Sequence, residues 1–260
     1  MKRRFDDPRH ILITGASSGI GKALALAYAA PGRTLSLTGR DMDRLNDVAQ
    51  EVRGRGAGAE IAAVDVTEEE ALARWLEDRD SDAPVDLLIA NAGISRHVSD
   101  FGEIGARTRE VFETNITGVL NTVLPLLPRM LERDRGQIAL MASLAGLINL
   151  PHAPAYSASK ACVRAYAESL RMTLAGTGVG VTAICPGFIR TPLTDRNRFR
   201  MPFLMEVEQA ADVIVKGLAR DKARIAFPGP MIAGVRLSAL LPYPLFDRLV
   251  GGKGRRPDGA

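Results

Sequence analysis

The sequence predicts an α/β fold in which one domain is built on a doubly wound parallel sheet of about seven strands, with helices on both faces. Short apolar runs of strand length alternate with segments of helical periodicity along most of the 260-residue chain. A glycine-rich turn lies directly between the first apolar run and the first helical segment. Such alternation is typical of parallel sheets, and a chain that is 46% hydrophobic can bury one sizeable core. We therefore expect a single domain over residues 1–260.

The expected elements follow one another as strand and helix. We expect strands at residues 10–14, 33–38, 60–64, 85–90, 137–142, 179–184 and 223–227. We expect helices at residues 22–30, 42–52, 68–78, 104–132 and 206–219, and a further helix after Pro154. Thr67 and Glu70 have the spacing of a capping box for the third of these helices. In the helix after Pro154, the apolar residues at near-helical spacing are Ala158, Ala161, Ala165, Leu170 and Leu174.

The first turn has the pattern of a phosphate-binding loop. Its glycines follow the spacing Gly-x3-Gly-x-Gly, and the residues concerned are Gly15, Ser17, Ser18, Gly19, Ile20 and Gly21. Glycine lets the backbone turn sharply and approach a pyrophosphate, and the following helix offers free N–H groups to the anion. The alternative is a glycine-rich loop without a ligand. The position between a strand and a helix favours dinucleotide binding.

The end of the second strand bears on the choice of cofactor. An acidic residue at this place would bind the adenosine ribose and repel a 2′-phosphate, whereas arginine accommodates that phosphate. The chain has Arg40, which favours NADP(H) and leaves NAD(H) as the alternative. Arg40 could also point to solvent, while Asp41 caps the next helix.

Two further strand ends carry candidate binding residues. Asp65 and Val66 follow the third strand, and Asp65 could accept from an adenine amino group or begin a turn. The fourth strand runs into Asn91, Ala92 and Gly93, whose small side chains would let the backbone lie against a flat ligand.

The best candidates for chemistry are Ser143, Tyr156 and Lys160. A spacing of four puts Tyr156 and Lys160 on one helix face, where the ammonium would lower the tyrosine pKa. Ser143 ends a buried strand, and its hydroxyl could bond the oxygen of a reacting carbonyl. The alternative is an ordinary solvated helix face and an ordinary strand end. Asn115 lies within a helix, where asparagine is disfavoured, so a bent helix or a polar site is expected there.

Composition narrows the functional classes. The net charge of +4 equals the excess of basic residues in segments 1–9 and 253–260, and the body lacks a basic helix, so nucleic acid is not an expected partner. The N-terminal segment lacks the apolar core of a signal peptide and no run of eighteen apolar residues occurs, so we expect a cytoplasmic protein. Cys162 and Cys185 are far apart and suggest neither a disulfide nor a metal site, so both are expected to be small buried hydrophobic residues.

Together these stretches resemble the short-chain dehydrogenase/reductase family over about residues 10–192. Ser143 precedes Tyr156 by the usual thirteen positions. The motifs that carry the resemblance, in the order of the family, are Thr14-Gly15-x3-Gly19-x-Gly21, Asp65, Asn91-Ala92-Gly93, Asn115, Ser143, Tyr156-x3-Lys160 and Pro186-Gly187.

The resemblance implies a Rossmann-like fold and a role for each catalytic position. It implies that Tyr156 is the general acid/base and that Lys160 lowers its pKa and holds the nicotinamide ribose. Ser143 would orient the substrate oxygen and Asn115 would support a water relay. It also implies homo-oligomers, either dimers or tetramers.

Further cofactor contacts are implied beyond the sixth strand. The backbone of Pro186, Gly187 and Ile189 would pass under the nicotinamide ring, and Thr191 would face its carboxamide. Tyr156 and Lys160 would also contact the cofactor.

The last third of the chain carries less information. Residues 193–220 are in the place of a substrate lid, residues 228–250 are apolar, and residues 251–260 form a basic tail. With Leu147, Ile148 and Leu150, the apolar lid residues would suit a bulky hydrophobic ketone or alcohol. Residues 228–250 could cover the substrate pocket, join subunits or touch a membrane surface. The expected lid also contains a basic stretch, Arg196, Arg198 and Arg200. This stretch could bind an anionic group of a ligand, or it is simply solvated.

The leading hypothesis is an NADP(H)-dependent oxidoreductase that interconverts a carbonyl and a secondary alcohol on a small molecule. A nucleotide-sugar epimerase or dehydratase of the extended branch is a second class, against which the glycine spacing and the modest C-terminal region argue. A third class is a non-catalytic dinucleotide-binding regulator or redox sensor. Such proteins usually lose catalytic residues, whereas this chain retains all four.

Overall fold

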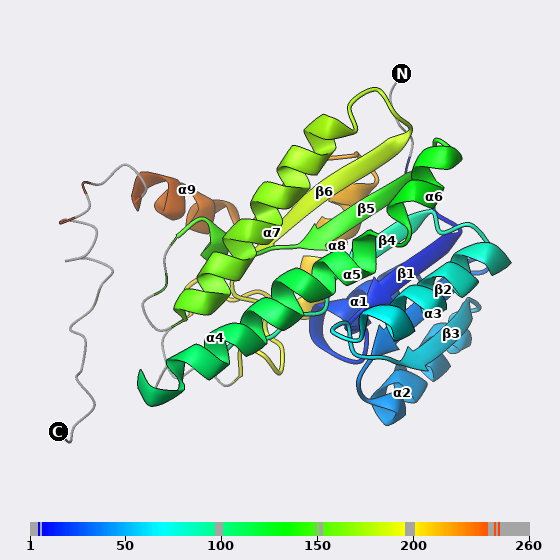
Figure 1. The fold of residues 1–260 in the computed structure, drawn as a ribbon, viewed down its shortest axis with the longest axis horizontal. Coiled ribbons are helices and arrows are strands. Elements are labelled where there is room, and N and C mark those ends of the chain that lie inside the picture. The colour runs from blue at the N-terminus through cyan, green and yellow to red at the C-terminus, as the bar shows by residue number, and fades with distance from the viewer. Residues whose placement is uncertain are drawn as a thin grey trace.

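The computed structural model describes residues 5, 7–96, 101–148, 150, 153–195, 201–238, 242 and 244. In this part of the chain, seven parallel strands form one sheet in the order β3-β2-β1-β4-β5-β6-β7 (Figure 1). This arrangement confirms the predicted α/β fold with a doubly wound parallel sheet. The strands are β1 (His10–Thr14), β2 (Thr34–Gly39), β3 (Gly58–Ala63), β4 (Leu87–Ala90), β5 (Gly136–Met141), β6 (Val179–Pro186) and β7 (Arg224–Phe227).

Helices cover both faces of the sheet. They are α1 (Gly19–Tyr28), α2 (Met42–Gly54), α3 (Glu69–Asp82), α4 (Ile104–Phe112), α5 (Gly118–Val123), α6 (Leu127–Glu132), α7 (Pro154–Thr173), α8 (Val207–Leu218) and α9 (Gly229–Ser238). Figure 1 shows α4, α5 and α7 across the near face, with α8 behind the sheet. Short 3-10 turns lie at Phe101–Glu103 and Leu144–Gly146.

Alternate residues of β1 belong to two separate cores. Ile11 and Ile13 are fully buried in the core that includes α1, α2 and α8. Leu12, between them, is buried in the core that includes α3, α5 and α7. Because successive side chains of a strand point to opposite faces, a central strand must be apolar on both sides, as this one is.

The strand order creates a crevice above the centre of the sheet. The chain runs outward from β1 through β2 to β3, then crosses to β4 on the other side of β1 and runs outward again to β7. The connections that leave β1 and β4 therefore diverge. Ligands of open parallel sheets bind at such a point, beyond the carboxyl ends of the strands.

The long helix expected at residues 104–132 is divided. A π-helical segment, Glu113–Thr117, separates α4 from α5, and three further residues separate α5 from α6. The asparagine expected to disturb the helix, Asn115, lies in the π segment. Pro128 lies in the first turn of α6, where its missing N–H costs nothing.

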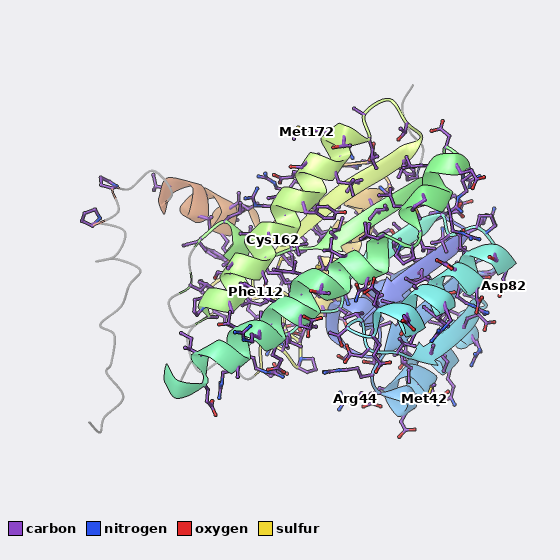
Figure 2. The ribbon with its side chains drawn as sticks, in the orientation of Figure 1. Met42, Arg44, Asp82, Phe112, Cys162 and Met172 are labelled. Atoms are coloured by element: carbon purple, nitrogen blue, oxygen red, sulfur yellow. The ribbon has the colours of Figure 1, made fainter. Side chains whose placement is uncertain are left out.

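Two local expectations were wrong. The capping box does not form, because the Thr67 hydroxyl donates to Asp65 and α3 begins after Glu68. The helix after Pro154 forms as expected, and α7 buries Ala155, Ser159, Val163 and Ala167 while Ala158 and Ala165 are exposed. Cys162 is exposed on the outer side of α7 (Figure 2), although Cys185 is buried as expected. Alanine and cysteine suit either side of a helix, so packing decided the face.

The described residues include only part of the C-terminal segments. The apolar segment 228–250 begins with α9, and the structure describes little of it beyond residue 238. Arg196, Arg198, Arg200 and residues 251–260 lie outside the described residues. Among the helices that are described, none is long and apolar enough to cross a membrane.

Candidate active site

The ends of β1 and β4 are tied together where the crevice opens. The Thr14 hydroxyl lies 3.2 Å from the Asn91 backbone nitrogen, which donates to it. In return, the Asn91 side-chain nitrogen donates to the carbonyl oxygens of Thr14 and Gly15, both at 3.0 Å. These bonds join residues 76 or 77 positions apart in sequence, and they hold the glycine turn against the Asn91-Ala92-Gly93 segment.

The glycine turn fits the close approach of a phosphate. Gly15 and Gly19 have φ angles of +65° and +55°, a left-handed conformation that favours glycine. At Gly21 a Cβ would lie 2.2 Å from the Gly15 carbonyl oxygen, so any side chain there would collide with the backbone. The backbone of this turn therefore faces the cavity beside the N-terminus of α1, which is the arrangement that binds pyrophosphate.

Arg40 and Asp65 meet at the ends of β2 and β3. The Arg40 guanidinium lies 3.9 Å from an Asp65 carboxylate oxygen, and the Arg40 side chain is 68% exposed. The other Asp65 oxygen accepts from the backbone nitrogen and the hydroxyl of Thr67, both at 3.0 Å. Asp65 thus begins a turn, which was one of the two roles expected for it. Asp41 caps α2 by accepting from the Arg44 backbone nitrogen, as expected.

Tyr156 and Lys160 lie on the same side of the first turns of α7. The Lys160 ammonium nitrogen lies 5.9 Å from the centre of the Tyr156 ring and donates to the Met141 carbonyl oxygen at 2.7 Å. Burial raises the pKa of the Tyr156 phenol, and the neighbouring Ser143 side chain opposes that rise. Burial lowers the pKa of Lys160 to about 8.

These pKa directions differ from one sequence-based expectation. Lys160 was expected to lower the tyrosine pKa, but in the chain alone the loss of solvation around the phenol dominates. The phenol is therefore protonated at neutral pH. That is the form able to donate a proton.

Ser143 follows β5 and is buried close to the end of β6. Its hydroxyl oxygen accepts from the Ala145 backbone nitrogen at 3.1 Å, and its O–H donates over 3.4 Å to the Pro186 carbonyl oxygen. Gly146 then packs on α7, where a Cβ would lie 2.6 Å from the Lys160 carbonyl carbon. This contact brings the serine turn against the helix that carries Tyr156 and Lys160.

Asn115 supports the site from behind the cavity wall. Its side chain is fully buried; the oxygen accepts from the Ile94 backbone nitrogen at 2.8 Å, and the nitrogen donates to the Ile94 carbonyl oxygen at 3.0 Å. The same nitrogen donates to the Ser159 hydroxyl, which donates to the Tyr156 carbonyl oxygen at 2.8 Å. Asn115 thus links the segment after β4 to the first turn of α7.

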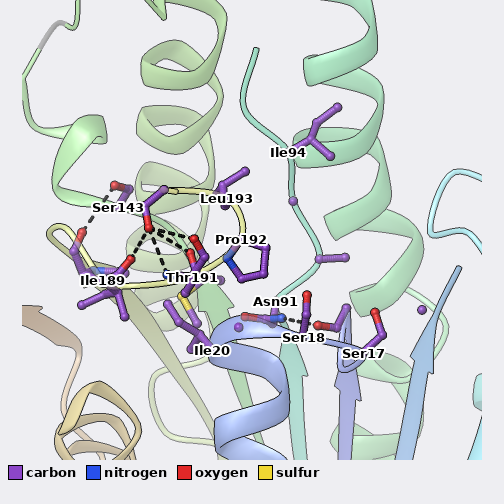
Figure 3. A pocket seen from close by; sticks show the side chains of 18 of the residues that line it. Ser17, Ser18, Ile20, Asn91, Ile94, Ser143, Ile189, Thr191, Pro192 and Leu193 are labelled. Atoms are coloured by element: carbon purple, nitrogen blue, oxygen red, sulfur yellow. Dashed lines mark hydrogen bonds between the residues drawn. The ribbon is translucent and has the colours of Figure 1, made fainter. Parts of the chain in front are cut away.

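One cavity collects nearly all of the candidate residues (Figure 3). Of the predicted catalytic and cofactor-binding residues, only Gly21 and Asn115 do not line it. Both lie directly behind it, Gly21 under the glycine turn and Asn115 against Ile94. The lining residues predicted from sequence are Gly15, Ser17, Ser18, Gly19, Ile20, Arg40, Asp65, Val66, Asn91, Ala92, Gly93, Ser143, Tyr156, Lys160, Pro186, Gly187, Ile189 and Thr191.

Sequence reasoning did not assign several other lining residues to the site. Most of them adjoin predicted residues at strand ends, so the position just beyond each apolar run was the available signal. Leu193 and Thr194 lie on the turn after β6, at the start of the segment expected to be the substrate lid, but no pattern in the sequence showed that these two residues face the cavity. The lining residues not assigned are Gly39, Val64, Ile94, Met141, Ala142, Pro192, Leu193 and Thr194.

The arrangement suits a bound dinucleotide and a proton transfer. A glycine turn at a helix N-terminus, an arginine at one end and a phenol with an ammonium at the other all face one cavity. Within the described residues, no group of three or more His, Cys, Asp or Glu side chains could hold a metal ion.

Comparisons with known proteins agree with this geometry. The family model for short chain dehydrogenases matches residues 9–201. An uncharacterized oxidoreductase of Myxococcus xanthus is 40% identical over 92% of this chain and 95% of its own length. A short-chain dehydrogenase from Sphingobium yanoikuyae, solved in complex with NADPH, has a TM-score of 0.78 and 27% identity over 90% of this chain and 96% of its own. A short chain dehydrogenase from Mycobacterium paratuberculosis bound to NAD has a TM-score of 0.75 and 26% identity over 84% and 95%.

Proposed function

Because this chain belongs to the short-chain dehydrogenase family, we propose that it uses NADP(H) to interconvert a carbonyl and a secondary alcohol on a small molecule. It is an NAD(P)-dependent oxidoreductase of that family. The observation that carries the proposal is the convergence of Tyr156, Lys160 and Ser143 on the cavity that the glycine turn also lines.

The residues around the cavity divide into places for each part of a dinucleotide. The glycine turn and the N-terminus of α1 would bind the pyrophosphate, and Asp65 with Val66 would lie beside the adenine. Lys160 would bind the nicotinamide ribose, and the 186–191 segment would lie along the nicotinamide. When bound, the nicotinamide supplies or accepts the hydride.

The protein supplies the proton and the orientation of the substrate. Tyr156 would donate its phenol proton to the carbonyl oxygen during reduction, because burial keeps the phenol protonated at neutral pH. The Ser143 hydroxyl would bond the same oxygen and stabilise the charge that develops on it. We infer that Lys160 makes the reverse reaction possible, since its ammonium would stabilise the phenolate formed when an alcohol is oxidised.

Asn115 has a supporting place in this scheme. Its buried amide fixes Ile94, which lines the cavity, and reaches the first turn of α7 through Ser159. The π-helical segment around it interrupts the regular backbone bonding, as π segments often do at functional sites. We propose that this interruption leaves room for the water relay that returns a proton to Tyr156.

Apolar residues at the cavity and near the Ser143 turn favour a hydrophobic substrate. Ile94 and Leu193 line the cavity, and Leu147 lies just beyond the Ser143 turn. We propose that residues 193–220 contain the lid, and that it begins with the segment between Thr191 and Met205. The two ends of that segment lie side by side, because Arg190 donates to the Met205 carbonyl oxygen at 2.9 Å and Met205 donates to Phe188 at 3.0 Å.

A panel of ketones and aldehydes with NADPH or NADH tests the proposal. We expect wild-type protein to oxidise NADPH with some hydrophobic members, and Tyr156→Phe to lower turnover by roughly 10²- to 10⁴-fold while NADPH affinity changes little. Carbonyl reduction should slow as pH rises through the pKa of Tyr156, and alcohol oxidation should accelerate. Tyr166→Phe removes a hydroxyl from the same helix, away from the cavity lining, and should leave turnover unchanged.

Two results would contradict the proposal in different ways. Full carbonyl reduction by Tyr156→Phe, with the wild-type pH dependence, would exclude Tyr156 as the acid. Cofactor binding without turnover of any panel member, or turnover only of a nucleotide sugar, would favour a regulator or an epimerase instead.

A further inference from the structure

Two threonines lie on the turn after β6, and Figure 3 labels one of them, Thr191, among the residues around the cavity. Thr191 and Thr194 both line the cavity. Thr191 extends toward the glycine turn, since its Cγ2 atom lies 3.3 Å from the position that a Cβ on Gly19 would take. A dinucleotide bound over the glycine turn would therefore pass beside Thr191.

The hydroxyl of Thr194 is the centre of this turn. It lies 2.6 Å from the Ile189 carbonyl oxygen and 3.0 Å from the Thr191 carbonyl oxygen. It also accepts from the Thr191 backbone nitrogen at 3.0 Å. A hydroxyl has a single proton, and here two carbonyl oxygens, which can only accept, compete for it. The Thr194 hydroxyl therefore has no proton to give to any other group.

This proton count sets the direction of the contact between the two side chains. The hydroxyl oxygens of Thr191 and Thr194 lie 3.3 Å apart, and geometry alone allows either to donate. Since the proton of Thr194 is directed to a carbonyl, a hydrogen bond between the two side chains requires Thr191 to be the donor. A Thr191 hydroxyl that points its proton at Thr194 leaves its lone pairs for an outside group, so it can act only as an acceptor toward a ligand.

We propose that Thr194 is a positioning residue that holds the Thr191 hydroxyl as a hydrogen-bond acceptor for the carboxamide NH₂ of the nicotinamide. The inference rests on the proposed binding of a nicotinamide cofactor in this cavity. An amide NH₂ can only donate, so an oriented acceptor distinguishes it from groups of the same shape that lack N–H.

The test compares NADP⁺ with its 3-acetylpyridine analogue, in which a methyl group replaces the NH₂. We expect wild-type protein to bind NADP⁺ roughly fivefold or more tightly than the analogue, the effect of about one hydrogen bond. In Thr194→Val the Thr191 hydroxyl is free to turn and donate to the carbonyl of the NADP⁺ carboxamide or to that of the acetyl group in the analogue. The ratio of the two affinities should therefore approach one. Thr194→Ser keeps the hydroxyl and should keep the wild-type ratio. If the chain proves to prefer NAD⁺, the same analogue pair of NAD⁺ is used.

Each other result is decisive. An unchanged ratio in Thr194→Val would overturn the proposal. The proposal would also fail if Thr194→Val lost as much affinity for 2′-phospho-ADP-ribose as for NADP⁺. That compound lacks the nicotinamide, so Thr194 would then only hold the loop together. If Thr194→Val does not fold, Thr194→Ala carries the test: retention of the wild-type ratio would overturn the proposal, and a ratio near one would support it. Wild-type protein that binds neither NADP⁺ nor NAD⁺ would refute the proposed function itself.

Discussion

Arg40 is the residue on which cofactor choice rests. Its side chain is mostly exposed, and an Asp65 carboxylate oxygen lies 3.9 Å from its guanidinium. An exposed ion pair of that length contributes little free energy, so the guanidinium is available to a 2′-phosphate. Arginine is suited to that group because its planar donors match the geometry of phosphate.

Arg40→Asp should shift preference from NADPH toward NADH. A charge-assisted bond to phosphate contributes about 1.5–3 kcal/mol, so the NADPH dissociation constant should rise roughly tenfold or more. Fluorescence titration with both cofactors measures the change. Arg44→Asp, in the first turn of α2 and paired with Asp41, is the matched control and should leave both constants unchanged. An unaltered NADPH dissociation constant in Arg40→Asp would show that Arg40 does not bind the 2′-phosphate.

Lys160 gives the site a second measurable property, its response to pH. Its pKa, lowered to about 8 by burial, means that the ammonium is present below pH 8 and is lost above it. If the ammonium binds the nicotinamide ribose, cofactor binding raises that pKa, and affinity must fall as pH rises through 8.

The NADPH dissociation constant should therefore increase by up to about tenfold between pH 7 and pH 9, the range that a pKa near 8 implies. Lys160→Met cannot titrate and should bind weakly at both pH values. Equal wild-type constants at pH 7 and pH 9 would show that the ammonium does not contact the cofactor.

At the scale of elements, α1 is held unusually close to the turn that precedes it. A Cβ on Gly21 would also lie 2.6 Å from the Asn91 side-chain nitrogen, the atom that ties β4 to β1. The third residue of α1 thus decides whether strand, turn and helix can pack together. Helix propensity favours alanine here, and packing excludes it.

Gly21→Ala should lower stability by about 1–3 kcal/mol, the usual cost of overpacking, and should abolish cofactor binding because the phosphate turn must move. Gly54→Ala is the matched control, since Gly54 also lies in a helix and a Cβ there meets nothing within 4 Å. That variant should be neutral or slightly more stable. Thermal unfolding and NADPH titration of the two variants provide the comparison, and equal behaviour would refute the packing explanation.

At the scale of the whole molecule, apolar side chains remain on the outer face formed by α4, α5 and α7. Met172 is 71% exposed and Phe112 is 38% exposed, with Cys162 between them on α7 (Figure 2). Exposed apolar surface on neighbouring helices is typical of an interface. We propose that a second copy of the chain covers this face.

Sedimentation velocity at micromolar concentration should therefore detect a dimer or a tetramer. Phe112→Arg places a charge on the proposed interface and should shift the protein toward monomer. Met42→Arg changes an equally exposed residue on α2, away from that face, and should leave the assembly as it is. A monomer in the wild type, or identical profiles for the two variants, would contradict this interface.

By itself, the sequence determined the order of strands and helices, the glycine turn and the candidates at the strand ends. These features are local, because the period of the apolar residues indicates a buried strand or helix. Polar residues just beyond several parallel strands lie at one edge of the sheet. The sequence alone could therefore indicate which residues would line the cavity, including Arg40, Ser143 and Tyr156.

Only the tertiary structure decided what depends on contacts between distant segments. The buried face of α7 was decided by the sheet beneath it, because its alanines and serines suit either side. The direction of the Tyr156 pKa depended on how much solvent the fold removes, which no spacing encodes. The hydrogen bonds of the Asn115 amide to Ile94 and Ser159 depend on the folded arrangement of the chain. So do those of Thr194 to Ile189 and Thr191. Hydrogen bonds of single side chains have no period in the sequence, so they are determined by packing.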